Sequence, residues 1–200
     1  MKKKQFRTGL QLLCVLMVLL TTMTAYVAGK YIKTISISGR VTFTASLATN
    51  MILQEHKAVR NPDGSYSLTA NTVNENTYIL IPGVDIPKDP HIIITGKTKI
   101  PAYLYIEIES SLDVPVKYTV DTSKWTLLQT DGTTSVYYYN TVIGEDFPED
   151  PIYILTDDQV TVSQTLLEGS DAAIDVLTIQ AILKEKVGGN TAAQTYKPNS

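Results

Sequence analysis

The sequence predicts an all-β protein, a single jelly-roll-like β-sandwich preceded by an N-terminal hydrophobic signal helix. The chain is rich in threonine, isoleucine, valine and tyrosine, which suit a pleated, half-buried surface. Apolar and polar residues alternate in several segments, and turn signals recur every ~8 to 15 residues, as in sandwiches. With 200 residues, 44% of them hydrophobic, the chain is long enough for one such domain and a targeting segment.

Residues 1–28 have the layout of a secretory signal peptide. The basic stretch MKKKQFR is followed by the apolar stretch GLQLLCVLMVLL and then by small residues. We expect cleavage after Ala25 or Ala28 by a signal peptidase. The alternative is an uncleaved membrane anchor, because residues 9–28 are just long enough to cross a hydrocarbon core of ~30 Å. Both alternatives predict a secreted or cell-surface protein.

The charge of the chain changes sharply after this leader. Residues 1–28 hold four of the 17 basic side chains and none of the 20 acidic ones, so the remainder has a net charge of about −7. Such a domain is repelled by polyphosphate chains, and we expect no nucleic-acid partner. The single cysteine, Cys14, lies in the leader, so the domain contains no disulfide and no thiolate metal site.

The first segment after the leader, residues 34–48, shows the clearest alternation in the sequence. Every second residue of this segment up to position 46 is polar and most of the residues between are apolar, which is typical of a strand with one buried face. The apolar positions are Ile35, Ile37, Val41, Phe43, Ala45 and Leu47.

Further strands follow along the domain, which we place at residues 29–186. They are expected at 51–59, 65–72, 78–81, 91–95, 100–111, 114–120, 125–129, 135–142, 152–155 and 159–166. Asn-Pro-Asp-Gly at 61–64 and Asp-Gly at 131–132 predict tight turns. Residues 171–186 fit strand or helix periodicity, and the neighbouring strands favour a strand. The Gly-, Thr- and Asn-rich tail 187–200 is expected to be disordered.

Two tyrosine-bearing strands allow a functional interpretation. In 100–111 the apolar residues alternate with Tyr103, Tyr105, Glu107 and Glu109, and we interpret the two glutamates as outward charges that discourage edge pairing. The run Tyr-Tyr-Tyr at 137–139 is either a contact patch or sugar platform, or ordinary packing along a sheet, which we favour.

Residues that carry chemistry are sparse. His56 and His91 are the only histidines and form no HExxH zinc motif; a two-histidine site with a carboxylate is conceivable, but ordinary strand or surface positions are favoured. No nucleophile motif or phosphate loop is present. We therefore assign no catalytic residue, cofactor or metal ligand and predict that the chain is not an enzyme.

One acidic loop lacks the residue spacing of a calcium-binding motif and is interpreted as solvent-exposed, with calcium binding as the alternative. Its carboxylates are Glu145, Asp146, Glu149 and Asp150.

Several segments together resemble a known family. The leader ends in TAYVAGKY and runs directly into ISISGRVTFTASLA; the block YILIPGVDIPKDPHIIITGKTKIPAYLYIEIE follows, and LTIQAIL lies near the end. This pattern resembles the TasA and camelysin group of exported Gram-positive proteins, whose signal peptides are of the SipW-dependent type.

The resemblance implies a jelly-roll-like sandwich at the cell surface or in the biofilm matrix. TasA-like subunits polymerise by lending an N-terminal strand to the next subunit, and residues 34–47 match that strand here. The assembly residues would be Ile35, Ile37, Val41, Phe43 and Leu47. The alternative is that this strand completes its own sandwich. We expect self-association and contacts with matrix or cell-wall components. A carbohydrate-binding or adhesive module is the first alternative function, and a camelysin-like metallopeptidase, which lacks its zinc motif here, is the second.

Overall fold

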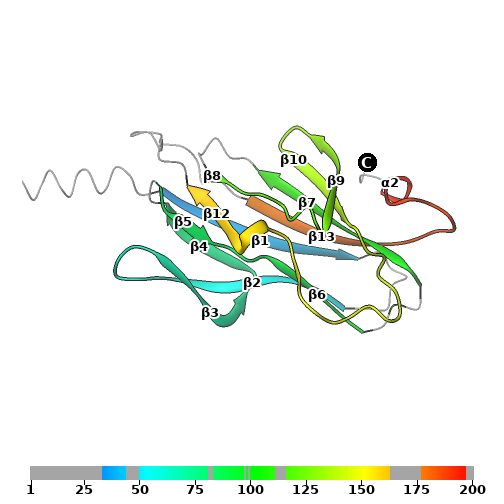
Figure 1. The fold of residues 1–200 in the computed structure, drawn as a ribbon, viewed down its shortest axis with the longest axis horizontal. Helices are drawn as coiled ribbons and strands as arrows, with labels where there is room; N and C mark the ends of the chain where they lie inside the picture. Colours follow the sequence, from blue (N-terminus) through cyan, green and yellow to red (C-terminus); the bar gives the residue numbers. More distant parts are fainter. Residues whose placement is uncertain are drawn as a thin grey trace, which may run out of the picture.

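The computed structural model shows a protein made almost entirely of strands (Figure 1). It describes residues 33–43, 50–80, 83–96, 98, 100–110, 116–162 and 177–196. The only helices in these ranges are a 3-10 turn, η1 (Thr156–Asp158), and α2 (Ala192–Thr195), so the predicted all-β class is confirmed. Neither helix approaches the length or apolar character needed to span a bilayer. The leader, with Ala25 and Ala28, lies outside the described residues.

A six-stranded sheet forms the larger part of the fold. In spatial order it contains β4 (Glu75–Leu80), β1 (Lys33–Phe43), β13 (Leu177–Glu185), β7 (Ala102–Ser110), β10 (Thr134–Tyr139) and β9 (Trp125–Asp131). Among the described ladders, only the pairing of β1 with β13 is parallel. β1 therefore lies between two strands that come from distant parts of the chain, with β4 antiparallel on its other side.

Two smaller sheets complete the fold. The four-stranded sheet has the order β11 (Ile152–Tyr153), β6 (His91–Thr95), β2 (Asn50–Arg60) and β3 (Tyr66–Val73). The three-stranded sheet has the order β5 (Asp85–Pro87), β12 (Gln159–Val162) and β8 (Val116–Lys117). Figure 1 shows β2, β3 and β6 along one side of the molecule and β7, β9 and β10 along the other.

One hydrophobic core joins the three sheets. Ile106 of β7, Leu53 of β2 and Val160 of β12 are all buried in the same cluster, together with Trp125. Alternation positions these side chains, because every second residue of a strand points to the same face. The arrangement is sandwich-like, with sheets packed around a shared interior.

The predicted strand positions agree with the structure in most places. The turn at residues 61–64 joins β2 to β3, and the Asp131-Gly132 turn joins β9 to β10, with Gly132 at a positive φ of 55°. The ambiguous segment is a strand over Leu177–Glu185. On β7 the residues Leu104, Ile106 and Ile108 are buried, as the alternation predicted.

The tail differs from the sequence-based expectation of disorder. Residues 192–195 form α2, and Ala192 and Tyr196 are buried against Tyr105 on the outer face of β7. Tyr105 Oη donates a hydrogen bond to the carbonyl of Ala192 at 2.8 Å. Composition suggested disorder, but a capping box, the buried Tyr196 ring and hydrogen bonds from Tyr103 and Tyr105 hold this segment against the sheet.

Candidate functional site

The register between β2 and β6 determines which side chains meet at one end of the smaller sheet. These strands pair antiparallel with Gln54 opposite His91, so position 56 falls opposite position 89 just beyond the ladder. Pro90 has no N–H group with which to continue the ladder. Instead, the backbone N–H of His56 donates to Oδ1 of Asp89 at 2.9 Å.

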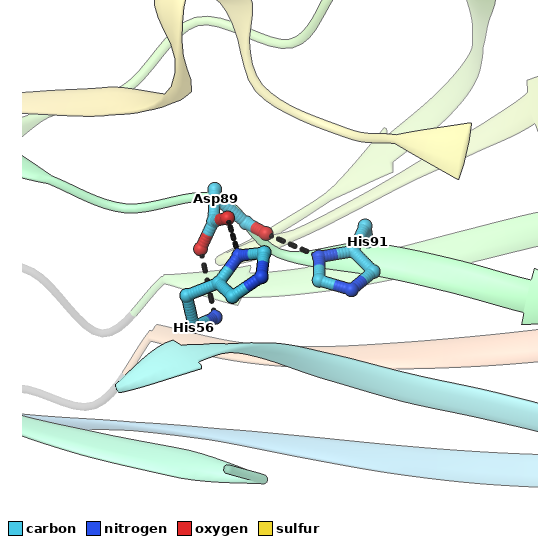
Figure 2. Close-up of side chains that lie close together, drawn as sticks. All are labelled: His56, Asp89 and His91. Carbon is cyan, nitrogen blue, oxygen red and sulfur yellow. Dashed lines mark hydrogen bonds and ion pairs between the residues drawn. The ribbon is translucent and has the colours of Figure 1, made fainter. Parts of the chain in front are cut away.

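This register brings the side chains of His56, Asp89 and His91 together (Figure 2). Nδ1 of His56 lies 2.5 Å from Oδ2 of Asp89, and the ring centroids of His56 and His91 are 5.3 Å apart. One ring nitrogen of each histidine and one carboxylate oxygen of Asp89 lie within 4.8 Å of one another. Two imidazoles and a carboxylate form a donor set that could hold a metal ion.

Hydrogen bonds fix the orientation of the His91 ring. Its Nδ1 lies 2.9 Å from the backbone carbonyl of Asp89, and a carbonyl only accepts, so Nδ1 carries the hydrogen. Nε2 then accepts a hydrogen bond from the side-chain nitrogen of Gln54 at 3.3 Å. The ring of Tyr153, on the neighbouring strand β11, packs 5.3 Å from the His91 ring. These contacts fix the ring so that Nδ1 is the donor nitrogen and Nε2 the acceptor nitrogen.

The three groups differ in their access to solvent. His91 and Asp89 are buried, with 2% and 4% of their surface exposed. The His56 side chain is 30% exposed. Solvent and small ions thus reach the group from the side of His56.

A buried ion pair lies on the opposite face of β2. Glu55 points into the core and pairs with Lys88, which precedes Asp89 in the chain. Burial raises the pKa of Glu55 and lowers the pKa of Lys88, while the opposite charge of each partner counteracts the shift. The ammonium group of Lys88 also lies 5.6 Å from the centre of the Tyr78 ring. The pair fastens β2 to the segment that carries Asp89.

Asn76 of β4 holds the backbone of β2 at His56. The β2–β3 register shifts between His56 and Ala58, so the ladder leaves backbone groups without their regular partners there. The Asn76 side chain donates to the His56 carbonyl at 2.8 Å and accepts from the Ala58 N–H at 2.9 Å. Because β4 belongs to the larger sheet, Asn76 also ties the two sheets together beside the histidines.

Asp158 adds a further carboxylate near the group. Asp157 and Asp158 in η1 have positive φ angles of 57° and 48°, and the Asp158 carbonyl accepts a hydrogen bond from the Lys88 N–H at 2.7 Å. The buried Oδ1 of Asp158 has no hydrogen-bond partner among the described residues. Burial raises the pKa of Asp158, the charge of Asp89 raises it further, and the charge of Lys124 counteracts both. The Asp158 carboxylate therefore lies close enough to Asp89 for the two charges to interact.

The predicted assembly residues lie on β1, except for one. Ile35 is in register with Tyr78 on β4, and on β13 Val41 is in register with Ala181 and Phe43 with Leu183. Ile37 is in register with Asn76 of β4 and Leu177 of β13. All five of these partner residues on β4 and β13 are buried. Leu47 lies outside the described residues.

The other candidate surfaces are accounted for by packing. The rings of Tyr139 and Trp125 meet edge to face, with their centroids 5.3 Å apart. Tyr137 packs on the main core, and Tyr138 packs on the opposite face of the sheet. This agrees with the packing interpretation of the tyrosine run. The edge-protecting role given to Glu107 and Glu109 was wrong, because β7 is an interior strand. Glu109 is exposed, whereas Glu107 accepts a hydrogen bond from Tyr196 Oη at 2.6 Å.

The acidic loop does not form a convergent site in the described part of the chain. Its four carboxylates are exposed, and Glu149 Oε1 accepts a hydrogen bond from the Gly96 N–H at 3.3 Å. Within the described ranges, the side chains that converge closely enough to hold a metal ion are instead those of His56, Asp89 and His91.

Sequence reasoning singled out both histidines but missed Asp89. The tripeptide Asp89-Pro90-His91 holds two potential ligands two residues apart, which is a weak signal on its own. His56 lies 33 residues before Asp89, and only the β2–β6 register shows that they meet.

Comparisons of this chain with protein-family models, curated proteins and solved structures give no match.

Proposed function

We propose that this chain is an exported structural subunit of the cell surface or biofilm matrix, which assembles through its N-terminal strand β1. The proposal includes no catalytic activity. It is supported by the signal-like leader, by the resemblance to the TasA and camelysin group, and above all by the position of β1 between β4 and β13. We infer that the sandwich is jelly-roll-like and that residues 1–28 form a helical signal segment.

The position of β1 suits exchange between subunits. Main-chain hydrogen bonds run along both of its edges, so it completes the larger sheet in the way that an added strand completes an open one. The same slot between β4 and β13 accepts either the subunit's own β1 or that of another copy. Exchange in one direction from copy to copy is a head-to-tail contact, which generates filaments when the rotation does not close.

Partner residues in the β1–β4 register provide a direct test of exchange. Ser36 and Thr77 face each other in antiparallel register, and replacing Cys14 with serine removes the natural thiol. We expect Ser36→Cys/Thr77→Cys to form a ladder of disulfide-linked oligomers when assembled protein is oxidised. Oxidation of the monomer before assembly should lock β1 into its own subunit and prevent polymerisation until the disulfide is reduced.

The matched control is Thr130→Cys/Ser135→Cys, a register pair on the β9–β10 hairpin away from β1. It should give only intramolecular disulfides and leave assembly unchanged. A wild-type chain that stays monomeric by light scattering and electron microscopy contradicts the proposal, and so does a locked monomer that assembles normally. Export is tested separately: N-terminal sequencing of the extracellular protein should begin after Ala25 or Ala28.

A further inference from the structure

We propose that His56, Asp89 and His91 bind one divalent transition-metal ion, for which zinc is the natural probe. The proposal is independent of polymerisation and goes beyond it. It is carried by the convergence of three ligand atoms within 4.8 Å, from a strand, the loop after β5 and the start of β6.

The donor set selects the class of ion. Two imidazole nitrogens and one carboxylate oxygen suit Zn²⁺ and its neighbours among the first-row divalent metals. Ca²⁺ and Mg²⁺ prefer six or more oxygen ligands and bind imidazole poorly. Zinc–ligand bonds of ~2.0 to 2.2 Å place the ligand atoms of a tetrahedral site about 3.4 Å apart. Side-chain rotations that move the ligand atoms by about 1 Å would therefore bring the three residues into coordination distance.

The surrounding hydrogen bonds already hold the ligands as a metal site requires. His91 donates through Nδ1 to the Asp89 carbonyl, which is how ligating histidines are usually oriented, and its Nε2 lone pair accepts only the long contact from Gln54, at 3.3 Å, which a metal ion would replace. The His56 N–H holds Oδ1 of Asp89, and Asn76 holds the His56 carbonyl. Little backbone ordering is left for the ion to impose, since β2 and β6 are already paired.

The charges around the site favour a cation. Asp89 lies close enough to interact with both Glu55 and Asp158, while the nearby lysines are Lys88, beside Glu55, and the partly exposed Lys124, which interacts with Asp158. The unpartnered Oδ1 of Asp158 lies outside the three-residue ligand group and would act on a bound water or through its charge. A dication would offset the excess negative charge and enter past the partly exposed His56. The bound ion would clamp β2 to the Asp89–His91 segment, so its role is to stabilise the sheet.

Zinc binding is best measured on the full chain with Cys14→Ser, so that no thiolate competes. The chain has two histidines, so both imidazole ring signals can be followed by ¹H–¹⁵N NMR while calorimetry measures affinity and stoichiometry. We expect one Zn²⁺ per chain, movement of both ring signals and a higher melting temperature. Co²⁺ should give visible absorption bands of a low-coordinate nitrogen and oxygen site, and Ca²⁺ should leave both rings unchanged.

Three variants test the ligands, and one tests unspecific binding. Asp89→Asn keeps the size of the side chain, and His56→Gln alters a partly exposed position, so both should fold, which circular dichroism would verify. Each should weaken zinc binding by about a hundredfold or more, at least as much as the loss of a residue that only hydrogen-bonds to a metal ligand. His91→Gln should behave in the same way if it folds. The control Glu145→Gln/Asp146→Asn, in the exposed acidic loop, should bind zinc like the parent.

Either of two results would overturn the proposal. One is the absence of zinc binding at about 100 µM free ion, a concentration far above the dissociation constants of zinc sites built by folded proteins. The other is binding that survives in both Asp89→Asn and His56→Gln, or that is lost in the acidic-loop control. His56, Asp89 and His91 would then be a hydrogen-bonded network with a purely structural role.

Discussion

At the residue scale, three tyrosines carry hydroxyl groups into the interior. Tyr78 and Tyr105 are fully buried, and Tyr196 covers Tyr105 from the C-terminal segment, with their ring centroids 5.3 Å apart. Burial raises the pKa of each, and for Tyr196 the hydrogen bond to Glu107 raises it further. Each hydroxyl donates to an oxygen acceptor, so the fold is matched to the protonated form.

This gives a prediction for alkaline pH. Unfolded tyrosines lose their protons near pH ~10, whereas the folded ones keep them, so the unfolded state binds fewer protons. The stability contributed by each tyrosine is complete below about pH 10 and falls above it, by up to about 1.4 kcal/mol per pH unit. Urea denaturation between about pH 8 and pH 11, with tyrosinate absorbance recorded in parallel, measures this slope.

The variant Tyr105→Phe serves as the comparison, because it removes one titrating group and keeps the ring. Its stability should fall less steeply with pH than that of the parent. Equal slopes, or a parent whose stability stays level up to about pH 11, would show that these hydroxyls ionise freely in the folded protein.

The candidate metal site shows what residue-level reasoning can and cannot reach. The rarity of histidine drew attention to His56 and His91, and a two-histidine site with a carboxylate was a recognised possibility. The identity of the carboxylate was not predictable. Asp89 meets His56 only because Gln54 pairs with His91, and a shift of the register by one residue would separate them.

At the element scale, the C-terminal segment is held by packing rather than by its own helical stability. α2 has four residues, far fewer than an isolated helix needs. Thr191 and Gln194 form a capping box, and Tyr196 supplies the buried anchor, with the ammonium group of Lys184 4.8 Å from its ring centre. The Thr-x-x-Gln spacing was a signal for this helix, but the polar composition around it favoured a prediction of disorder.

Removing that anchor should release the segment. We expect Tyr196→Ala to lower the free energy of unfolding by about 3 kcal/mol, in the range seen for buried aromatic residues truncated to alanine. Limited proteolysis should then cut between residues 187 and 196. Val187→Ala, at a site that is 60% exposed, should change stability by less than about 0.5 kcal/mol. If the two variants are equally stable, the segment does not depend on Tyr196.

The strands were the most predictable elements, for a local reason. The alternation of β7 and the turn chemistry at Asp131-Gly132 are encoded within a few residues, and the structure agrees with both. The role of Glu107 was mistaken because alternation gives the face of a strand and not its place in the sheet. Since β7 lies between β13 and β10, it has no free edge for a charge to protect.

At the scale of the whole molecule, the larger sheet depends on contacts between distant segments. β1 pairs in parallel with β13, which lies more than 130 residues later in the chain. No local pattern specifies such a partner, which is why the strand was predictable and its neighbours were not. Without β1, β4 and β13 would each present an unpaired edge, and an exposed edge promotes association.

The dependence on β1 leads to a complementation experiment. A chain that begins at residue 44 lacks β1, and we expect it to lose cooperative unfolding because the sheet divides between β4 and β13. A synthetic peptide of residues 33–43 should restore the transition, with a melting temperature that rises with peptide concentration, as it does for any ligand of the folded state. The control peptide carries Ile37→Lys and Phe43→Lys, at positions in register with buried Leu177 and Leu183. The control peptide should not restore the transition, because a lysine beside these buried leucines would lose its hydration without gaining a partner. A truncated chain that is as stable as the parent, or rescue by both peptides alike, would mean that the slot between β4 and β13 does not select β1, and assembly through strand exchange would lose its physical basis.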